Sequence, residues 1–340
     1  MIGKFSNIEV RGIVTTVPNQ IETNDRYVEI LGEQRVKKQA RITGIQKRHI
    51  DKWSQTTADL CITSAKKLLK DLAWGPDEIR VLVMVTQHPS LIMPSSAFIV
   101  QKYLGINHDC IVFDVNLGCS GFVSGIHIVS SLLQSYGVGA KGLLLTGDIQ
   151  RNPYRRKPDT KEEFADQMLF GSAGSVTALE NVEGVGTIWF DEKTDGTRYS
   201  VISQHFDEKS VMDGEAVFEF AVNDVTDYIN AFFAELKKQN AVSPDYYVFH
   251  QAQQFMLQNV ASICGIEQEK MLYSLKEYGN TSSASIPLTL CFNKDLLKPK
   301  NVQNIFLCGF GIGLSCALMQ LSVKSDIVLE ILESDEEYKY

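Results

Sequence analysis

Residues 111–121 read IVFDVNLGCSG, and this stretch joins a short apolar run to the start of an amphipathic pattern. The run at 111–115 is typical of a strand that is buried on both faces of a sheet. Glycines at positions 118 and 121 permit a sharp turn on each side of Cys119. We therefore expect Cys119 to lie between a strand and a helix N-terminus, where unpaired N–H groups and the helix dipole favour a thiolate. The stretch predicts Cys119 as a nucleophile.

Strands and helices alternate on both sides of this stretch. Apolar residues at helical spacing predict helices, and short continuous apolar runs predict buried parallel strands. The predicted helices are 57–73, 223–238 and 255–264, with one more that carries Phe122, Ile126, Val129 and Leu133 and another around Ala317. The predicted strands are 81–86, 111–115, 142–146, 246–250 and 304–308. The pattern indicates an α/β chain in two similar halves, 1–175 and 176–325. A charged surface loop is expected at 150–166, and a peripheral acidic tail at 326–340.

Length and composition limit the function classes. The chain has 340 residues, 44% of them hydrophobic and 22% charged, which is typical of a folded protein of about two domains. Its formal net charge of −8 argues against general nucleic-acid binding. The N-terminus has no signal-peptide core, and no run reaches 18 apolar residues, so we expect a cytoplasmic protein without a membrane span. Seven cysteines without a C-x-x-C pair or a histidine cluster argue against a metal site and against disulfides.

Three further motifs follow Cys119 along the chain. His250 ends a predicted strand in VFHQAQ, which places it at the crevice beyond the carboxyl ends of a parallel sheet. Asn280 lies in YGNTSS, and 309–313 reads GFGIG. Taken singly, these motifs also fit a buried core histidine, an ordinary turn and a tight glycine turn. The other five histidines (His49, His88, His108, His127 and His205) have no comparable context.

The order of these motifs indicates thiol acyl transfer. An acyl-enzyme reaction needs a nucleophile, side chains that assist it, and N–H donors for the oxyanion intermediate. The chain offers a cysteine, a histidine, an amide side chain and a glycine turn that presents N–H groups. The glycine turn does not fit a dinucleotide site, because it spells G-x-G-x-G and opens no βαβ unit.

The motifs also resemble a known family. The segments VNLGCSGFVSGI, VFHQAQ, YGNTSSASIP and CGFGIGLSCALMQL are similar to the active-site blocks of β-ketoacyl-(acyl carrier protein) synthase III, a member of the thiolase superfamily. Supporting blocks in the same order are ARITGIQKRHI, MPSSAFIVQKYLGI, LFGSAGSV and MDGEAVFEFAV, so the resemblance extends from about residue 8 to 322.

The resemblance implies a thiolase-like αβαβα sandwich of two similar halves and a homodimer. It implies that Cys119 accepts the acyl group, that His250 and Asn280 serve decarboxylation, and that the N–H groups of Cys119 and Ile312 form the oxyanion hole. It implies a substrate pocket that includes Met93, Gln253, Gly311 and Gly313. The implied substrates are acyl-CoA or acyl carrier protein thioesters, with no bound cofactor and with the carrier protein as partner.

Several positions depart from the family pattern. Lys38 and Ile42 stand where the family has a tryptophan and an arginine that clamp coenzyme A, and Phe164 stands near another arginine position. Phe255 replaces a basic carrier-docking residue, and Ser172 replaces the aspartate of FGD. Two clusters of basic residues could still dock a carrier protein or its pantetheine arm. The alternative is that these clusters are ordinary solvated surface. The docking candidates are Lys38, Arg41, Arg151, Arg155 and Phe164.

The sequence thus predicts a ketosynthase that performs decarboxylative Claisen condensation. The departures favour a specialised role in secondary-metabolite or surface-glycan acyl chemistry over fatty acid initiation. One alternative is an acyltransferase of the same fold that moves the acyl group from Cys119 to a hydroxyl or amine. A non-catalytic partner subunit is disfavoured, because Cys119, His250 and Asn280 are all present.

Overall fold

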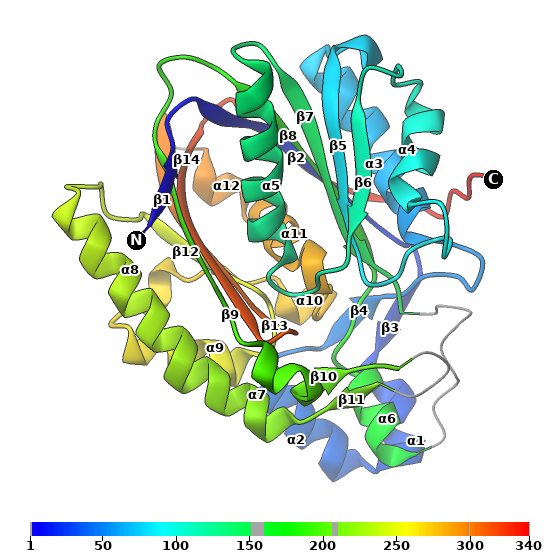
Figure 1. Ribbon diagram of the computed structural model, residues 1–340. Coiled ribbons are helices and arrows are strands. Elements are labelled where there is room, and N and C mark those ends of the chain that lie inside the picture. Colours follow the sequence, from blue (N-terminus) through cyan, green and yellow to red (C-terminus); the bar gives the residue numbers. More distant parts are fainter. Residues whose placement is uncertain (1, 151–159, 206–209, 299, 340) are drawn as a thin grey trace.

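Two β-sheets organise the computed structural model, which describes residues 2–150, 160–205, 210–298 and 300–339 (Figure 1). Within these residues, the first sheet has the strand order β15-β2-β8-β7-β5-β6 and the second β1-β9-β14-β13-β12. The strands of the first sheet are β15 (Val328–Glu333), β2 (Ile8–Val17), β8 (Ala173–Asn181), β7 (Lys141–Asp148), β5 (Ile79–Val85) and β6 (Ile111–Val115). Those of the second are β1 (Gly3–Phe5), β9 (Ile188–Thr194), β14 (Ser315–Lys324), β13 (Val302–Gly311) and β12 (Tyr246–Phe249).

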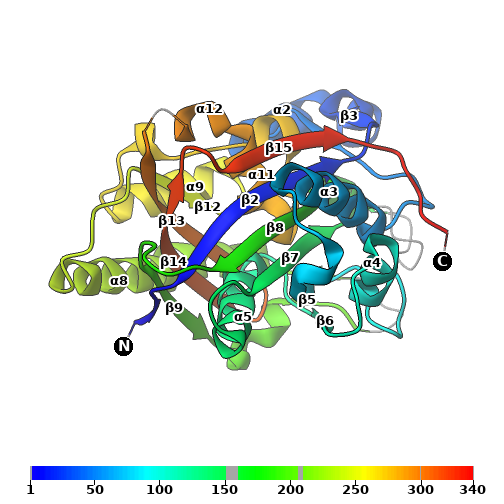
Figure 2. The same cartoon turned by 90° about the horizontal axis from the view of Figure 1, so that it is seen from above.

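Helices cover the outer faces of both sheets and fill the space between them (Figures 1 and 2). α5 (Gly121–Tyr136) and α11 (Ser285–Phe292) form the middle layer. α3 (Thr57–Leu72) and α4 (Ser96–Leu104) pack on the first sheet, and α8 (Thr226–Lys238) and α9 (Gln254–Ile263) pack on the second. The predicted αβαβα sandwich is confirmed.

Smaller elements complete the part of the chain that the structure describes. β3 and β4 form a two-stranded antiparallel sheet, and β10 and β11 form a second one. Their bounds, with those of the remaining helices, are β3 (Ile21–Thr23), β4 (Lys47–His49), β10 (Ile202–Ser203), β11 (Val211–Met212), α1 (Val28–Leu31), α2 (Glu33–Thr43), α6 (Lys161–Gln167), α7 (Gly214–Phe220), α10 (Leu275–Tyr278) and α12 (Lys294–Leu297). A π-helical turn at Ala221–Val225 joins α7 to α8.

The middle helix α5 is positioned by its own apolar side chains. Phe122, Ile126, Val129 and Leu133 are buried in one core cluster with strands of both sheets. Gly125 lets the helix lie close to β7, because a Cβ there would be 2.5 Å from Leu144 Cδ1. This packing fixes the N-terminus of α5, and with it the preceding turn that carries Cys119, inside the molecule.

Helix α3 shows how the local sequence and the packing agree. Thr56 and Asp59 form a reciprocal capping box at its start, and Ala73 in the left-handed region ends it. Its apolar residues Leu60, Cys61, Ala65 and Leu68 are fully buried against the first sheet. Burial of such a side chain contributes about 1.5–3 kcal/mol, which makes this face the main source of helix stability.

The chain after β13 differs from the prediction. Ala317 was expected in a helix, but it lies in β14, which pairs antiparallel with β13 over its whole length. The prediction was wrong because an apolar run such as CALMQL fits a buried strand as well as a helix. The glycine-rich turn therefore closes a hairpin and does not begin a helix.

Four other expectations also differ from the structure. The expected acidic tail contains β15, which pairs parallel with β2 at the edge of the first sheet (Figure 2). The expected boundary between the two halves, at residues 175 and 176, falls inside β8. The expected loop at 150–166 includes the start of α6. Residues 151–159 of that loop lie outside the described residues. β6 is a partly exposed edge strand, although its apolar sequence predicted burial on both faces.

The described residues lack two kinds of feature. No helix within them is long and apolar enough to cross a membrane. No group of three or more His, Cys, Asp or Glu side chains within the same residues is arranged to hold a metal ion.

Candidate active site

Cys119 lies in the turn between β6 and α5, and its side chain is half-buried. The end of β13 passes directly over this turn. A Cβ at Gly311 would lie 2.9 Å from Cys119 Sγ, and a Cβ at Gly309 would lie 2.8 Å from the carbonyl oxygen of Cys119. Both distances are too short for any side chain, so the glycines allow the backbone of β13 to approach the cysteine.

The main-chain N–H groups of Ile312 and of Cys119 itself lie close enough to the sulfur of Cys119 to affect its pKa. These are the two groups that the resemblance implied for an oxyanion hole. They lower the pKa of the thiol, but burial and the nearby carboxylate of Asp148 raise it more, to about 12. Burial and the Asp148 carboxylate therefore oppose the stabilisation of a thiolate that was expected at the helix N-terminus.

His250 follows β12 and is buried beside the end of β13. Its main-chain N–H donates to the carbonyl of Cys308 at 2.7 Å, and its ring meets Phe310 edge-on at a centroid distance of 6.1 Å. Its Nδ1 lies 2.8 Å from Ser285 Oγ. Burial lowers the pKa of His250 to about 4, although a hydrogen bond with the main chain of Ser282 opposes this shift. The imidazole is therefore neutral at pH 7.

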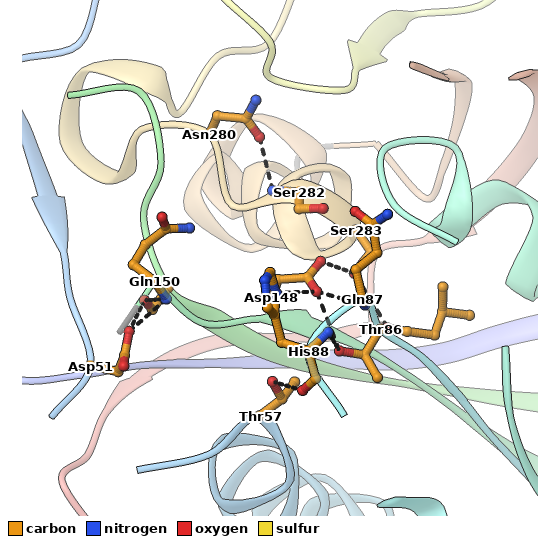
Figure 3. Close-up of polar contacts among 12 residues, drawn as sticks. Asp51, Thr57, Thr86, Gln87, His88, Asp148, Gln150, Asn280, Ser282 and Ser283 are labelled. Carbon is orange, nitrogen blue, oxygen red and sulfur yellow. Dashed lines mark hydrogen bonds and ion pairs between the residues drawn. The ribbon is translucent and has the colours of Figure 1, made fainter. Parts of the chain in front are cut away.

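Asn280 is buried after α10, and its main chain pairs with residues 169–171. Its side-chain Oδ1 accepts the N–H of Ser282 at 2.9 Å (Figure 3). This hydrogen bond assigns the oxygen of the amide, so the NH₂ group is left to donate elsewhere. Among the described residues, none is recorded as an acceptor for that NH₂ group.

A continuous set of contacts joins the three motifs. Cys119 contacts Gly311 and Ile312, Phe310 contacts the His250 ring, and Ser282 hydrogen-bonds both His250 and Asn280. Residues that are separated by up to 193 positions in the sequence are thus joined by contacts that reach the sulfur of Cys119. The parallel pairing of β12 and β13 and the middle layer of helices make this arrangement.

The structure places the other predicted residues more loosely around the site. Gln253 occupies the N-cap position of α9 without a side-chain capping hydrogen bond, and Gly313 lies in the turn after β13. Met93 is 81% exposed, so it does not enter the pocket of its own chain. Gly311 contacts Cys119 as described above.

Three of the five predicted docking residues lie on two helices. Lys38 and Arg41 are exposed on α2, and Arg41 lines a surface cavity of about 530 Å³ with Gln254, Tyr273 and Lys276. Phe164 on α6 packs against an apolar cluster from α1 and α2. Arg151 and Arg155 lie outside the described residues.

Sequence reasoning missed two buried carboxylates near the site. Asp51 accepts the hydroxyl of Ser172 at 2.5 Å and the N–H of Gln150 at 2.7 Å, so a carboxylate is present although Ser172 replaces the expected aspartate. Asp148 pairs with His88 at 2.9 Å (Figure 3). A signal for Asp148 was available, because it ends a buried parallel strand as His250 does.

Known proteins share this sequence and fold. The family profile described as "3-Oxoacyl-[acyl-carrier-protein (ACP)] synthase III C terminal" matches residues 237–323. The β-ketoacyl-[acyl-carrier-protein] synthase III of Streptococcus suis is 30% identical over 336 residues, which cover 94% of this chain and 99% of that protein. The crystal structure of 3-oxoacyl-(acyl-carrier protein) synthase from Burkholderia xenovorans LB400 has a TM-score of 0.91 at 30% identity and covers 98% of this chain and 99% of that one. OleA from Xanthomonas campestris shares the fold at 22% identity, with a TM-score of 0.81 and coverage of 95% and 98%.

The αβαβα layers and a cysteine at the start of the middle helix define a condensing enzyme of the thiolase superfamily. Within that superfamily, the full-length similarity shows that the chain belongs to the β-ketoacyl-[acyl-carrier-protein] synthase III family.

Proposed function

We propose that this enzyme catalyses the decarboxylative Claisen condensation of an acyl group on Cys119 with a malonyl-type thioester. In the first step, Cys119 Sγ attacks the donor carbonyl, and the N–H groups of Ile312 and Cys119 hold the oxyanion. The donor thiolate leaves and takes up the proton that Cys119 lost. The product of this step is acyl-Cys119.

In the second step, a malonyl-type thioester loses CO₂ to form an enolate, whose oxygen accepts hydrogen bonds from His250 and Asn280. The enolate carbon then attacks acyl-Cys119, and the cysteine leaves as a thiolate that takes up a proton. The observation that carries this proposal is the hydrogen bond of Ser282 N–H to Asn280 Oδ1, which leaves the amide NH₂ as a donor beside a neutral imidazole. Two neutral donors are suited to a developing enolate, because they stabilise charge without giving up a proton.

The test measures the two steps separately in wild type, Cys119→Ala and Asn280→Ala. Intact mass reports acylation by a panel of acyl thioesters, and radiolabelled CO₂ reports malonyl decarboxylation. Cys119→Ala should gain no acyl group, whereas Asn280→Ala should form acyl-Cys119 nearly normally and release CO₂ about 10²-fold more slowly. Normal CO₂ release by Asn280→Ala would overturn the proposal. If wild type releases no CO₂ but transfers its acyl group to an alcohol or amine, the acyltransferase alternative replaces it.

We propose further that the acyl donor is a carrier-protein thioester and that the role is specialised, in secondary-metabolite or surface-glycan acyl chemistry. Lys38 is exposed, and Phe164 packs into its own helical cluster, so neither offers the aromatic and guanidinium clamp expected for coenzyme A. Phe255 is 52% exposed at the position where a basic docking residue was expected. Matched carrier-protein and coenzyme A donors in the acylation assay identify the donor by kcat/KM.

We also propose that the enzyme works as a cytoplasmic homodimer without a bound cofactor. Each proposed step uses only groups of the chain and of its two thioesters. The exposed Met93 and the partly exposed edge strand β6 support a second subunit on this side of the first sheet. In such a dimer, Met93 would reach the acyl pocket of the partner, where a flexible side chain suits a long or irregular acyl group.

A further inference from the structure

A buried carboxyl group that the proposed mechanism does not use lies where the end of β7 meets the segment before β8. Asp51 follows β4, and both Asp51 and Ser172 are 0% exposed. Asp51 Oδ1 accepts the hydroxyl of Ser172 at 2.5 Å and the N–H of Gln150 at 2.7 Å (Figure 3). The same N–H lies 3.0 Å from Ser172 Oγ. The three groups therefore form a closed network that holds Ser172 at the end of β7.

Ser172 belongs to the segment that pairs with the main chain of Asn280. The N–H of Ser172 donates to the carbonyl of His49 at 2.8 Å. The N–H of Gly171 donates to the carbonyl of Asn280 at 2.9 Å, and the N–H of Asn280 donates to the carbonyl of Leu169 at 2.8 Å. Both main-chain polar groups of Asn280 are thus held by the segment before β8.

The two segments are also in close contact. A Cβ at Gly171 would lie 2.3 Å from the carbonyl oxygen of Tyr278 and 3.4 Å from Thr281 Cγ2, so the contact extends to both sides of Asn280. Asn280 Oδ1 accepts the N–H of Ser282, which lies in the same turn. This hydrogen bond fixes the amide relative to its own turn. The direction of the amide NH₂ therefore follows the position of the turn.

Asp51 supplies the acceptor on which this arrangement depends. Without it, the hydroxyl of Ser172 and the N–H of Gln150 would lose an acceptor at a site that is closed to solvent. Buried donors without an acceptor are unfavourable, so the segment before β8 would shift towards another partner. Both hydrogen bonds use Oδ1 of Asp51. An amide oxygen at the same place would accept them as well.

We propose that Asp51 and Ser172 are positioning residues for Asn280: they hold the segment before β8, which holds the Asn280 turn so that the amide NH₂ faces the malonyl-type thioester. The proposal rests on the proposed role of Asn280 in decarboxylation. Neither residue touches a reacting atom. Displacement of a catalytic group by about 1 Å is enough for a large loss of rate. The pair should therefore act on decarboxylation and not on acylation of Cys119, whose oxyanion donors lie on other segments.

The first measurement is hydrogen–deuterium exchange, read by mass spectrometry of the peptides that contain Gly171 and Asn280. Asp51→Ala and Ser172→Ala should speed exchange in both peptides about tenfold or more, because the N–H groups lose fixed partners. Asp51→Asn keeps an acceptor oxygen at the position of Oδ1 and should stay within about threefold of wild type. Unchanged exchange in Asp51→Ala, or equal effects of Asn and Ala at this position, would overturn the proposal. Exchange needs no substrate, so its result is independent of whether the enzyme decarboxylates malonyl thioesters.

The second measurement separates positioning from a general loosening of the fold. Asp51→Ala should lower kcat for CO₂ release about tenfold or more, with KM for the malonyl thioester and the rate of Cys119 acylation within about threefold of wild type. Asp51→Asn should restore kcat. Equal losses of CO₂ release and acylation would show a general structural role and refute the positioning role. A wild type that releases no CO₂ refutes the proposed function, and exchange still decides whether the pair fixes the Asn280 turn.

Asp59→Ala is the matched control, because Asp59 is another buried carboxyl group, 1% exposed, at the start of α3. Its side chain accepts the N–H and hydroxyl of Thr56 and the N–H of Tyr338. The control should lower the melting temperature without changing exchange in the two peptides or the ratio of CO₂ release to acylation. An effect equal to that of Asp51→Ala would contradict the proposal. Thermal melting shows whether each variant is folded, and Ser172→Ala provides the test if Asp51→Ala does not fold.

Discussion

At the scale of single residues, the absence of a side chain at Gly311 is as important as the presence of one at Cys119. Gly311 has φ +153°, and its Cα lies close enough to Cys119 that any Cβ would meet the sulfur at 2.9 Å. The next residue, Ile312, contributes its N–H to the same sulfur. The position of the proposed oxyanion donor therefore depends on the glycine before it.

Gly311→Ala should reduce the rate of acyl-Cys119 formation by about 10²-fold or more, because displacement of the sulfur or of the Ile312 N–H by about 1 Å is enough for such a loss. Intact-mass acylation kinetics measure the effect. Gly137→Ala is the control, since Gly137 also has a positive φ, of +84°, but has open space around its Cα. It should lose stability without losing acylation rate. Acylation by Gly311→Ala within threefold of the control would contradict this account of the site.

At the scale of elements, a buried charge cluster fixes the two-stranded β3–β4 sheet beside the site. Arg48 on β4 is fully buried and donates to Glu22 of β3 at 3.1 Å and to Asn24 at 2.8 Å. Its guanidinium also lies over the ring of Tyr27. A Cβ at Gly279 would be 2.9 Å from Arg48 Cγ, so the arginine stem packs against the turn that leads into Asn280. The β3–β4 sheet thereby supports the asparagine segment.

Arg48→Met should lower the free energy of unfolding by about 3 kcal/mol, because the buried Glu22 carboxylate loses its buried charged partner and keeps only the exposed Arg26. Urea denaturation measures the loss. Lys37→Met provides the comparison, since Lys37 pairs with Glu33 on the exposed surface of α2. Its effect should be within about 1 kcal/mol. Equal effects of the two substitutions would show that the Arg48 cluster is not a stabilising unit.

At the scale of the whole molecule, one side of the first sheet carries unpartnered apolar groups. β6 is its edge strand, and Ile92, Met93, Phe98 and Ile111 near that edge are all at least 36% exposed. An exposed apolar edge strand favours association with another chain. This side is the candidate face for the proposed homodimer.

Light scattering at micromolar concentration should give the mass of a dimer, and Phe98→Glu should shift it towards the monomer, because a charge would be buried at the interface. Val242→Glu is the matched control. Val242 is 66% exposed and follows α8, at the opposite end of the molecule from α4 (Figure 1). A dimer that is unaffected by Phe98→Glu, or a monomeric wild type, would contradict this assignment of the face.

The sequence by itself determined the local features of this protein. Helical spacing predicted α3, α5, α8 and α9, and apolar runs predicted β5, β7 and β12, because these patterns arise from side chains close together in the chain. Glycines beside Cys119 and a strand end at His250 indicated where chemistry could occur. The order of these motifs was sufficient for the family.

Tertiary structure alone decided the features that depend on distant parts of the chain. β14 is a strand because β9 and β13 pair with it on both sides, and β15 is part of a sheet because β2 offers a free edge. The Asp148–His88 pair joins residues 60 positions apart. The protonation of Cys119 and His250 follows from burial and from charges brought close by folding, and a local motif does not encode either of these.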